Sequence, residues 1–266
     1  MRFGCCGSMI SPAADPIGVE VIESLAEMGF DYIELSLRDI AELPEKAFNE
    51  LRRRVSNSGI GCEACNNFFP ARIRLTGADA DHGGALEYAR MALARAARLG
   101  ADIVVFGSSG ARNVPPGFPL DAAWKQLVEL LGNLGALADA YGITIAIEPL
   151  TKLESNIINL ASEGLLLSRA VDRPNVRLLI DYYHLTMEKE DPAVVLLAGQ
   201  DVRHVHIAKA EGRVFPKEKD AGFVCFFSGL REIRYRGKCS VEAYTKDFTP
   251  DAKRALRILK DLGEGG

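Results

Sequence analysis

The chain has no hydrophobic run long enough to cross a membrane. Its opening residues hold no apolar stretch of signal-peptide length, and no later segment approaches the ~18 apolar residues of a membrane-spanning helix. We therefore expect a cytoplasmic protein with no membrane partner, whose six cysteines stay reduced. Cys62 and Cys65 have the spacing of a redox or zinc pair, but no second pair accompanies them. We expect them to belong to the core or to line a pocket.

The chain also lacks a strong charge of either sign. Its net charge of −4 gives no general attraction to a polyanion, and its basic runs are as short as Arg52–Arg54. That run falls within a predicted helix, where it is typical of a solvent-facing surface. We expect no nucleic-acid partner.

No linker, low-complexity segment or block of like charges divides the sequence, and we expect residues 1–266 to form a single domain. Short apolar runs alternate with longer helical patterns from end to end. The expected strands cover residues 2–4, 32–35, 60–63, 102–106, 143–147, 176–180, 202–207 and 240–243. The expected helices cover residues 16–28, 44–55, 84–99, 120–141, 157–171, 192–197, 226–235 and 251–262.

This alternation predicts an α/β fold with a parallel sheet, because a parallel crossover needs a helix to return the chain. Eight strand–helix units favour closure into a (β/α)8 TIM barrel, and the chain length is close to the ~250 residues typical of that fold. An open, doubly wound sheet is the alternative.

Polar residues occupy the ends of the last four expected strands, where the loops of a barrel build its active site. These residues are Glu148, Asp181, His206 and Glu242. Each ends an apolar run, where an ionisable group is costly to bury without a partner. A structural ion pair would explain one such position. Four in succession, spaced by 33, 25 and 36 residues, favour a shared site.

Three carboxylates and one imidazole suit a hard or borderline divalent ion. We expect one metal ion, Mn²⁺ in the first place, with Mg²⁺, Co²⁺ and Zn²⁺ as alternatives. Of His204 and His206, we expect only one to face the barrel axis. We assign His206, which is nearer to the C-terminal end of its strand, and expect His204 to pack outward against a helix.

These residues stand in segments that resemble the xylose-isomerase-like barrel proteins, specifically the sugar phosphate isomerase/epimerase group with its ketose 3-epimerases and hydroxypyruvate isomerases. The resemblance extends over nearly the whole chain and is sharpest after residue 143. The segment EPLTKLESNIIN, residues 148–159, is similar to the ketose 3-epimerase segment in which the first Glu binds metal and the second, here Glu154, contacts substrate. The segment GFDYIE, residues 29–34, looks like the signature of strand two.

Three later motifs carry the resemblance further. Asp181-Tyr-Tyr-His184 matches the metal-binding Asp and a substrate-binding His. His204-x-His206 matches the element whose second His is a ligand, and Ser-Val-Glu242 matches the final ligand. The ligand set implied by the resemblance is therefore the one reached from the strand ends.

The resemblance implies a metal-dependent isomerase or epimerase acting on a small sugar or keto-sugar. A proton next to a carbonyl is removed, and the metal acts as a Lewis acid that stabilises the enediolate. Strands five and eight are separated by roughly 135° around a barrel of eight, so Glu148 and Glu242 are expected to approach the substrate from different faces. The expected catalytic pair is therefore Glu148 and Glu242, with Glu154, His184 and Arg213 on substrate oxygens. Glu34 and Asn66–Asn67 are expected at the opposite wall, where they could equally be cap or turn residues.

One departure from the family pattern concerns substrate choice. Arg213 lies seven residues after the metal-binding His rather than six, and the usual Pro-Gly-x-Gly stretch is replaced by residues 214–220. The metal site is unaffected, but the family's substrate is not carried over. A Gly/Ser turn at residues 107–110, with Arg112 and Lys152, leaves a phosphorylated substrate open.

Three other functions are open from the sequence. An inosose-type dehydratase would begin with the same proton abstraction. An apurinic-site endonuclease would need a histidine-rich zinc cluster, which four histidines and an acidic chain argue against. A non-catalytic sugar-binding protein would not need a complete ligand set. The sequence leaves open whether the chain forms a homo-oligomer.

Overall fold

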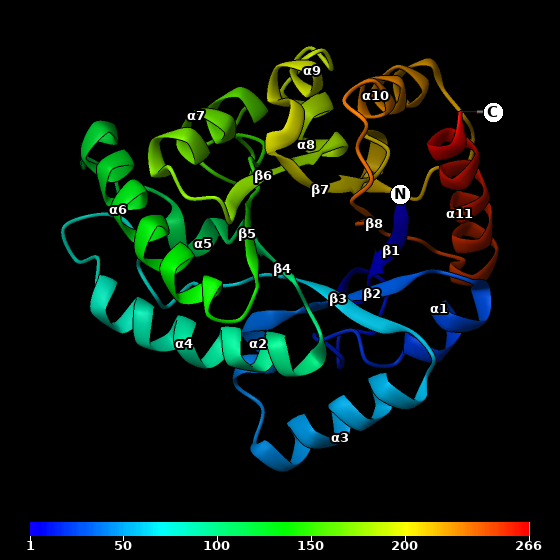
Figure 1. Cartoon of the computed structure of the whole chain (residues 1–266), viewed down its shortest axis with the longest axis horizontal. Helices are drawn as coiled ribbons and strands as arrows, with labels where there is room; N and C mark the ends of the chain where they lie inside the picture. Colours follow the sequence, from blue (N-terminus) through cyan, green and yellow to red (C-terminus); the bar gives the residue numbers. More distant parts are fainter. Residues whose placement is uncertain (266) are drawn as a thin grey trace.

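The computed structural model describes residues 1–265, and its eight strands close into one parallel barrel in sequence order (Figure 1). The predicted (β/α)8 TIM barrel is confirmed, and the open sheet is excluded. The strands are β1 (Arg2–Cys6), β2 (Tyr32–Ser36), β3 (Gly61–Asn66), β4 (Ile103–Phe106), β5 (Thr144–Ile147), β6 (Val176–Asp181), β7 (Val202–Ile207) and β8 (Lys238–Val241).

The helices form a ring around the strands (Figure 1). The longer ones are α1 (Ile22–Met28), α3 (Glu45–Asn57), α4 (His82–Leu99), α6 (Leu120–Asp139), α7 (Ala161–Val171), α10 (Ala221–Glu232) and α11 (Phe248–Glu264). The short ones are α2 (Leu37–Ala41), α5 (Ser109–Arg112), α8 (Tyr182–Met187) and α9 (Val194–Ala198), with 3₁₀ turns η1 (Gly7–Met9), η2 (Gly199–Asp201) and η3 (Glu211–Arg213).

Helices α1 and α7 begin at least four residues later than predicted because polar side chains bind the backbone ahead of them. The carboxylate of Asp15 accepts hydrogen bonds from the N–H groups of Gly18 and Glu20, so residues 16–21 form a turn and α1 begins only at Ile22. The side-chain amide of Asn159 donates to the carbonyl oxygens of Leu150 and Ser155. The helix predicted from residue 157 therefore begins at Ala161.

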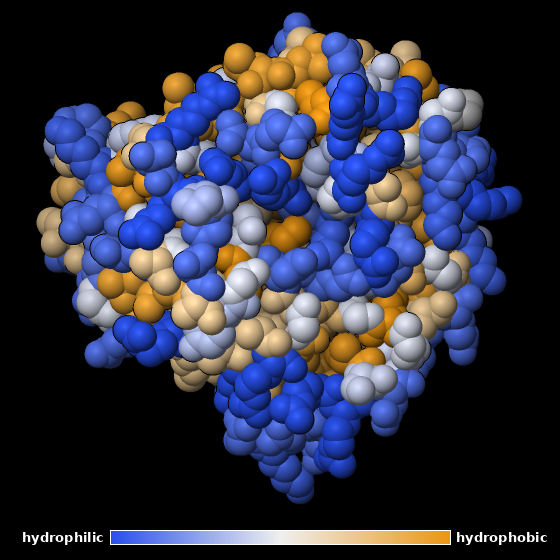
Figure 2. Space-filling view, in the orientation of Figure 1, coloured by the Kyte–Doolittle hydropathy of each residue, from blue (hydrophilic) through white to orange (hydrophobic). Residues whose placement is uncertain are grey.

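The predicted solvent-facing basic run lies on α3. Phe48, Leu51 and Val55 are buried on one side of this helix, while Arg52 and Arg53 are exposed on the other. Hydrophilic residues accordingly cover the lower end of the molecule, where α3 lies (Figure 2). Among the described residues, none of the helices combines the length and apolar composition of a membrane span.

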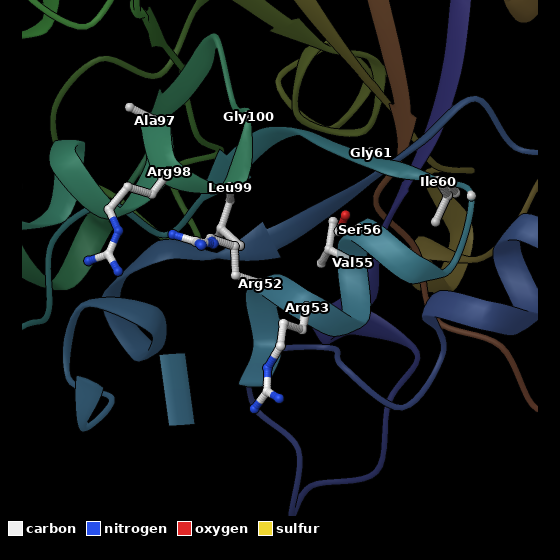
Figure 3. Close-up of a pocket in the computed structure, with 11 residues that line it drawn as sticks. Arg52, Arg53, Val55, Ser56, Ile60, Gly61, Ala97, Arg98, Leu99 and Gly100 are labelled. Atoms are coloured by element: carbon white, nitrogen blue, oxygen red, sulfur yellow. The ribbon is translucent and has the colours of Figure 1, made fainter. Parts of the chain in front are cut away.

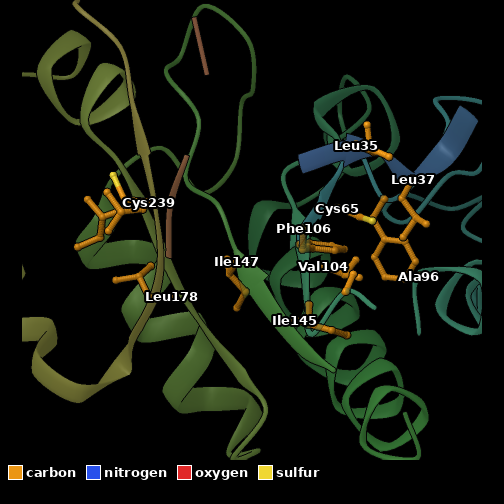
Figure 4. Packing of buried hydrophobic residues seen from close by; sticks show 14 of the residues in the cluster. Leu35, Leu37, Cys65, Ala96, Val104, Phe106, Ile145, Ile147, Leu178 and Cys239 are labelled. Atoms are coloured by element: carbon orange, nitrogen blue, oxygen red, sulfur yellow. The ribbon is translucent and has the colours of Figure 1, made fainter. Parts of the chain in front are cut away.

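The hydrophobic core has two parts. The larger part fills the space between the strands and the helices, where Val104 of β4 and Ile145 of β5 are paired neighbours (Figure 4). Cys62 and Cys65 are fully buried there as free thiols, which confirms that they belong to the core. The smaller part fills the barrel interior with Tyr32, Ala64, Ile103, Val105, Ala146 and Leu179.

Above this apolar interior layer, the inward side chains become polar. Tyr32 reaches across the barrel because β1 has a glycine beside it: a Cβ on Gly4 would lie 2.3 Å from the Tyr32 ring. The next inward residues along β2, β7 and β8 include Glu34, His204 and Ser240, all fully buried. The barrel therefore changes from apolar to ionisable toward the C-terminal ends of its strands.

Candidate metal centre and active site

Four buried side chains meet at the C-terminal end of the barrel. Glu148, Asp181, His206 and Glu242 each offer one ligand atom, and these atoms all lie within 4.8 Å of one another. Their exposed fractions are 5, 3, 0 and 7%. The structure thus brings together all four residues expected to hold a metal ion.

Backbone pairing fixes where these side chains point. Asp181 and His206 are direct partners between β6 and β7, and His206 pairs with Ser240 of β8. Glu148 and Glu242 each come directly after their strand. The N–H of Glu148 donates to the carbonyl of Phe106, and the N–H of Glu242 donates to that of Ile207. Each carboxylate therefore starts from a rigid strand end rather than from a free loop.

The donor atoms fit a divalent cation. Nδ1 of His206 lies 3.1 Å from Oε1 of Glu148 and 3.4 Å from Oε2 of Glu242. Oδ1 of Asp181 accepts a hydrogen bond from the N–H of Tyr183, but Oδ2 is buried with no hydrogen-bond partner among the described residues. A buried carboxylate oxygen without a donor is costly, and three carboxylates with one imidazole are a suitable ligand set for such an ion.

Crowded carboxylates shift one another's pKa values. Burial raises the pKa of Asp181 to about 6, partly opposed by Arg213, and burial together with Glu242 raises the pKa of Glu148. Burial also acts on Glu242, but His206 and Arg213 outweigh it and lower its pKa to about 2. Asp181 and Glu148 therefore bind a proton more tightly than an exposed carboxyl does, and a bound divalent cation would favour their ionised forms.

Arg213 supplies positive charge at the mouth of the cluster. Its guanidinium donates to Oε2 of Glu242 and, at 3.2 Å, to Oε1 of Glu154, and it lies 3.7 Å from Oδ2 of Asp181. It also stacks on the ring of Tyr183, with 4.7 Å from the guanidinium carbon to the ring centroid. The expected substrate-binding residues Glu154 and Arg213 are therefore in contact with each other, and Arg213 also pairs with two proposed metal ligands, Glu242 and Asp181.

His184 directs a free N–H into the same site. Its Nδ1 accepts a hydrogen bond from the backbone N–H of Thr151 at 3.0 Å, so its Nε2 carries the proton of the neutral ring. Burial lowers the pKa of His184, which favours that neutral ring. Nε2 lies 3.6 Å from Oδ2 of Asp181 and is buried with no hydrogen-bond partner among residues 1–265.

A hollow of about 170 Å³ opens onto Glu148, Glu154, Arg213 and Glu242. Pockets for drug-sized ligands are about 300–1,000 Å³, so this space suits a small molecule. The rest of its wall comes from residues that follow strands β1 to β5. Those lining residues are Met9, Arg38, Asn67, Phe69, Ala71, Ser108, Ser109, Gly110 and Leu150.

A larger hollow lies elsewhere in the molecule. It measures about 670 Å³ and is lined by the ends of α3 and α4 and by the turn that leads into β3, with Arg52, Arg53 and Arg98 among its residues (Figure 3). Since β3 begins there, this hollow is at the N-terminal end of the barrel, away from the carboxylates. That end of a TIM barrel contributes to stability rather than to catalysis.

The expectation that His204 packs outward is wrong. Residues two apart on a strand share a face, so His204 and His206 both point into the barrel. Nε2 of His204 lies 2.8 Å from Oε2 of Glu34, and Nε2 of His206 lies 3.1 Å from Oε1 of the same carboxylate. Glu34 is fully buried beneath the metal-ligand cluster and does not line the hollow. Its position therefore differs from the substrate wall that the sequence suggested.

Arg112 and Lys152, the two cationic side chains that suggested a phosphorylated substrate, both pair with protein groups. Arg112 is fully buried and donates to the carbonyl oxygens of Phe106, Glu148 and Ile158. It is therefore a structural support beneath Glu148. The ammonium of Lys152 is largely exposed, at 3.6 Å from the carboxylate of Glu188.

Asn66 and Gly107 also shape the cluster. The amide of Asn66 donates to Oε1 of Glu242 at 3.1 Å, which orients that carboxylate. A Cβ on Gly107 would lie 2.2 Å from Oε2 of Glu148, so only glycine leaves the carboxylate where it is. The sequence had placed Asn66 at the wall of the site. The requirement for glycine at position 107 depends on how closely Glu148 approaches it, and this distance is known only from the structure.

Comparisons with a family model and with curated proteins agree on one family of similar proteins. The model of the xylose isomerase-like TIM barrel family matches residues 22–262. A D-psicose 3-epimerase of Agrobacterium fabrum is 26% identical over 251 residues, which cover 92% of this chain and 85% of that protein. An L-ribulose 3-epimerase of Methylomonas sp. is 32% identical over 137 residues, about half of each chain.

The similarity in fold extends over nearly the whole length of this chain. A solved structure of D-allulose 3-epimerase from Methylomonas sp. superposes with a TM-score of 0.87 at 25% identity, and the match covers 98% of both chains.

Proposed function

Because the chain belongs to the xylose isomerase-like TIM barrel family, we propose that it is a metal-dependent epimerase that inverts the carbon next to the carbonyl of a small ketose. The observation that carries the proposal is the convergence of Glu148 and Glu242 with Asp181 and His206 at the mouth of a small hollow. Two relatives whose names specify epimerisation at carbon 3 support carbon 3 as the reacting position.

The four ligands, Glu148, Asp181, His206 and Glu242, would hold one divalent ion, for which we propose Mn²⁺. When bound, such an ion supplies Lewis-acid polarisation of the carbonyl and the neighbouring hydroxyl of the substrate. The proton on the carbon between them then becomes acidic enough for a carboxylate to remove.

Epimerisation needs two groups on opposite faces of the reacting carbon. Glu148 follows β5 and Glu242 follows β8, and both border the hollow in which substrate would lie. One glutamate, as a carboxylate, removes the proton, and the other, as a carboxylic acid, returns a proton to the opposite face. In the reverse reaction, Glu148 and Glu242 exchange these two roles.

Three residues are suited to hold substrate oxygens. His184 offers a buried Nε2–H, Arg213 offers a guanidinium at the rim, and Glu154 accepts from substrate hydroxyls beside Arg213. Since Arg112 is buried and Lys152 is turned to Glu188, we propose an unphosphorylated sugar.

The test is product analysis with protein loaded with Mn²⁺. A panel of free ketoses, 3-keto sugars, inososes and a sugar phosphate is incubated, and the products are identified by NMR. We expect an epimer of at least one free ketose. Dehydration of an inosose in place of epimerisation, or no reaction with any free sugar, would contradict the proposal.

A further inference from the structure

We propose that Glu34, in the barrel interior, is a positioning residue that fixes His206 so that its Nδ1 faces the metal ion. The inference rests on the proposed function only in requiring that the four-ligand cluster binds a divalent ion. It does not depend on which sugar the protein takes.

Glu34 is a carboxylate held entirely inside the barrel. It has no exposed surface, and three side chains hydrogen-bond to it. Oε1 accepts from Nε2 of His206 at 3.1 Å, while Oε2 accepts from Nε2 of His204 at 2.8 Å and from Oγ of Ser240 at 2.6 Å. Each of these hydrogen bonds therefore comes from β7 or β8, two of the four strands that carry or directly precede the proposed metal ligands.

A purely structural role does not call for a charge at this position. The layer directly below is apolar, with Ile103, Val105 and Leu179 filling the interior. Replacing a buried ionic group by a well-packed apolar one is often neutral or stabilising, because desolvating the charge is costly. The carboxylate is therefore explained by what it does to its neighbours rather than by packing.

Its effect on His206 follows from the two ends of the imidazole ring. Nε2 faces Glu34, whereas Nδ1 faces Glu148 and Glu242. With an acceptor at Nε2, that nitrogen keeps its proton and Nδ1 is the one that binds metal. A ring flip would place carbon atoms against both sets of oxygens, so the Glu34 hydrogen bond also selects the ring orientation. Carboxylates behind ligating histidines commonly act this way, and removing them weakens metal binding by about 10–100-fold.

Glu34 is itself held in place on its other oxygen. Ser240 donates to Oε2 and also contacts the hydroxyl of Tyr32 at 2.7 Å, and His204 lies 3.1 Å from the carbonyl of Lys238 through its Nδ1. The network predicts a graded response: loss of Glu34 is most damaging, and loss of the Ser240 hydroxyl is milder.

The test measures Mn²⁺ affinity by the electron paramagnetic resonance signal of free Mn²⁺. We expect Glu34→Gln to weaken binding about 10–100-fold and Ser240→Ala to weaken it by a smaller factor. Ser168→Ala is the matched control: its buried hydroxyl donates to the carbonyl of Val176, outside this network, and its affinity should equal that of the unchanged protein.

A spectroscopic readout separates positioning from a loss of fold. In the Mg²⁺-loaded protein labelled with ¹⁵N-histidine, the Nε2 proton of His206 should resonate far downfield and move upfield in Glu34→Gln. Unchanged affinity and unchanged histidine signals in Glu34→Gln would overturn the proposal. If that variant does not fold, unchanged affinity in Ser240→Ala overturns it. Tight Mn²⁺ binding without turnover of any ketose would instead contradict the proposed function alone.

Discussion

The backbone N–H of Thr151 donates a hydrogen bond to Nδ1 of His184, at 3.0 Å. This bond joins the loop after β5 to the short helix α8, and it fixes the protonation of the ring. Since Nδ1 accepts, Nε2 carries the proton, and that N–H points into the site without a partner among the described residues. His184 therefore holds the loop after β5 through Nδ1 and offers a hydrogen-bond donor to the site through Nε2.

The two functions of His184 can be separated by two substitutions. His184→Asn keeps an acceptor at the Nδ1 position but loses the Nε2–H, so kcat/KM should fall about 10–100-fold as one buried hydrogen bond to substrate is lost. His184→Gln keeps a donor near the Nε2 position but loses the Thr151 bond, so the Tm should fall by a few degrees. Steady-state kinetics and thermal unfolding measure the two effects. Full activity in His184→Asn would remove this residue from substrate binding.

Gly107 should be required for the metal ligand next to it. Because a Cβ would lie 2.2 Å from Oε2 of Glu148, Gly107→Ala must displace that carboxylate. We expect Mn²⁺ affinity to fall about tenfold or more, since the carboxylate of a proposed metal ligand is moved. The matched control is Gly132→Ala in α6, where nothing lies within 4 Å of the new Cβ and Tm should hold or rise slightly. Calorimetry on both variants is the measurement, and equal affinities would contradict the expectation.

Arg213 should stabilise the protein chiefly when no metal is bound. Its guanidinium neutralises Glu242 and lies close to Asp181, so Arg213→Gln leaves buried carboxylates without a counter-charge. We expect a loss of about 3–5 kcal/mol in the free energy of unfolding without metal. Saturating Mn²⁺ should restore most of it, because the ion binds only the folded state.

The measurement is thermal unfolding of this variant with and without Mn²⁺. Arg53→Gln, on the exposed side of α3, serves as the control and should leave the Tm unchanged both with and without Mn²⁺. The same loss of stability in both metal states would mean that Arg213 acts through packing alone.

The stability that Glu188 supplies should disappear in acid. Its carboxylate accepts from the hydroxyl of Thr151 at 2.6 Å and from the N–H of Lys152 at 2.8 Å. Burial opposes ionisation, but these hydrogen bonds prevail and lower the pKa of Glu188 below its ordinary value near 4.5. A carboxyl with a lowered folded pKa stabilises above the unfolded pKa and loses that effect as the pH falls through the folded one.

Glu188→Gln should therefore unfold at a lower temperature than the unchanged protein at pH 7, and the difference should shrink as the pH falls below 4.5 and vanish below the lowered pKa of the folded state. Unfolding curves from pH 7 to pH 3 test this, with Glu50→Gln on the exposed side of α3 as the control. A difference that stays constant across this range would contradict the assignment.

The barrel and the convergence of the four proposed ligands could be predicted because both follow from position along the chain. Apolar strands recur with helices between them, and an ionisable residue at the end of such a strand is costly unless something compensates it. Glu148, Asp181, His206 and Glu242 meet both conditions. Their convergence needs only the rule that parallel strands end on one face of the barrel.

Contacts across the barrel interior could not be predicted in the same way. Glu34 and His204 are 170 residues apart, and no spacing indicates which inward residues of β2 and β7 meet. Arg112 looked like a free cation in a loop, yet it is buried against three carbonyl oxygens. Such contacts depend on how far side chains extend across the closed barrel interior. The spacing of apolar residues along the sequence does not describe this.

The most direct test of the proposed chemistry is turnover of a ketose substrate in D₂O by the Mn²⁺-loaded protein. Proton removal by one glutamate and return by the other predicts that the epimer formed carries deuterium at carbon 3, and that Glu242→Gln forms no epimer while its fold persists. An epimer formed without deuterium at that carbon, or undiminished epimer formation by Glu242→Gln, would contradict the two-carboxylate mechanism.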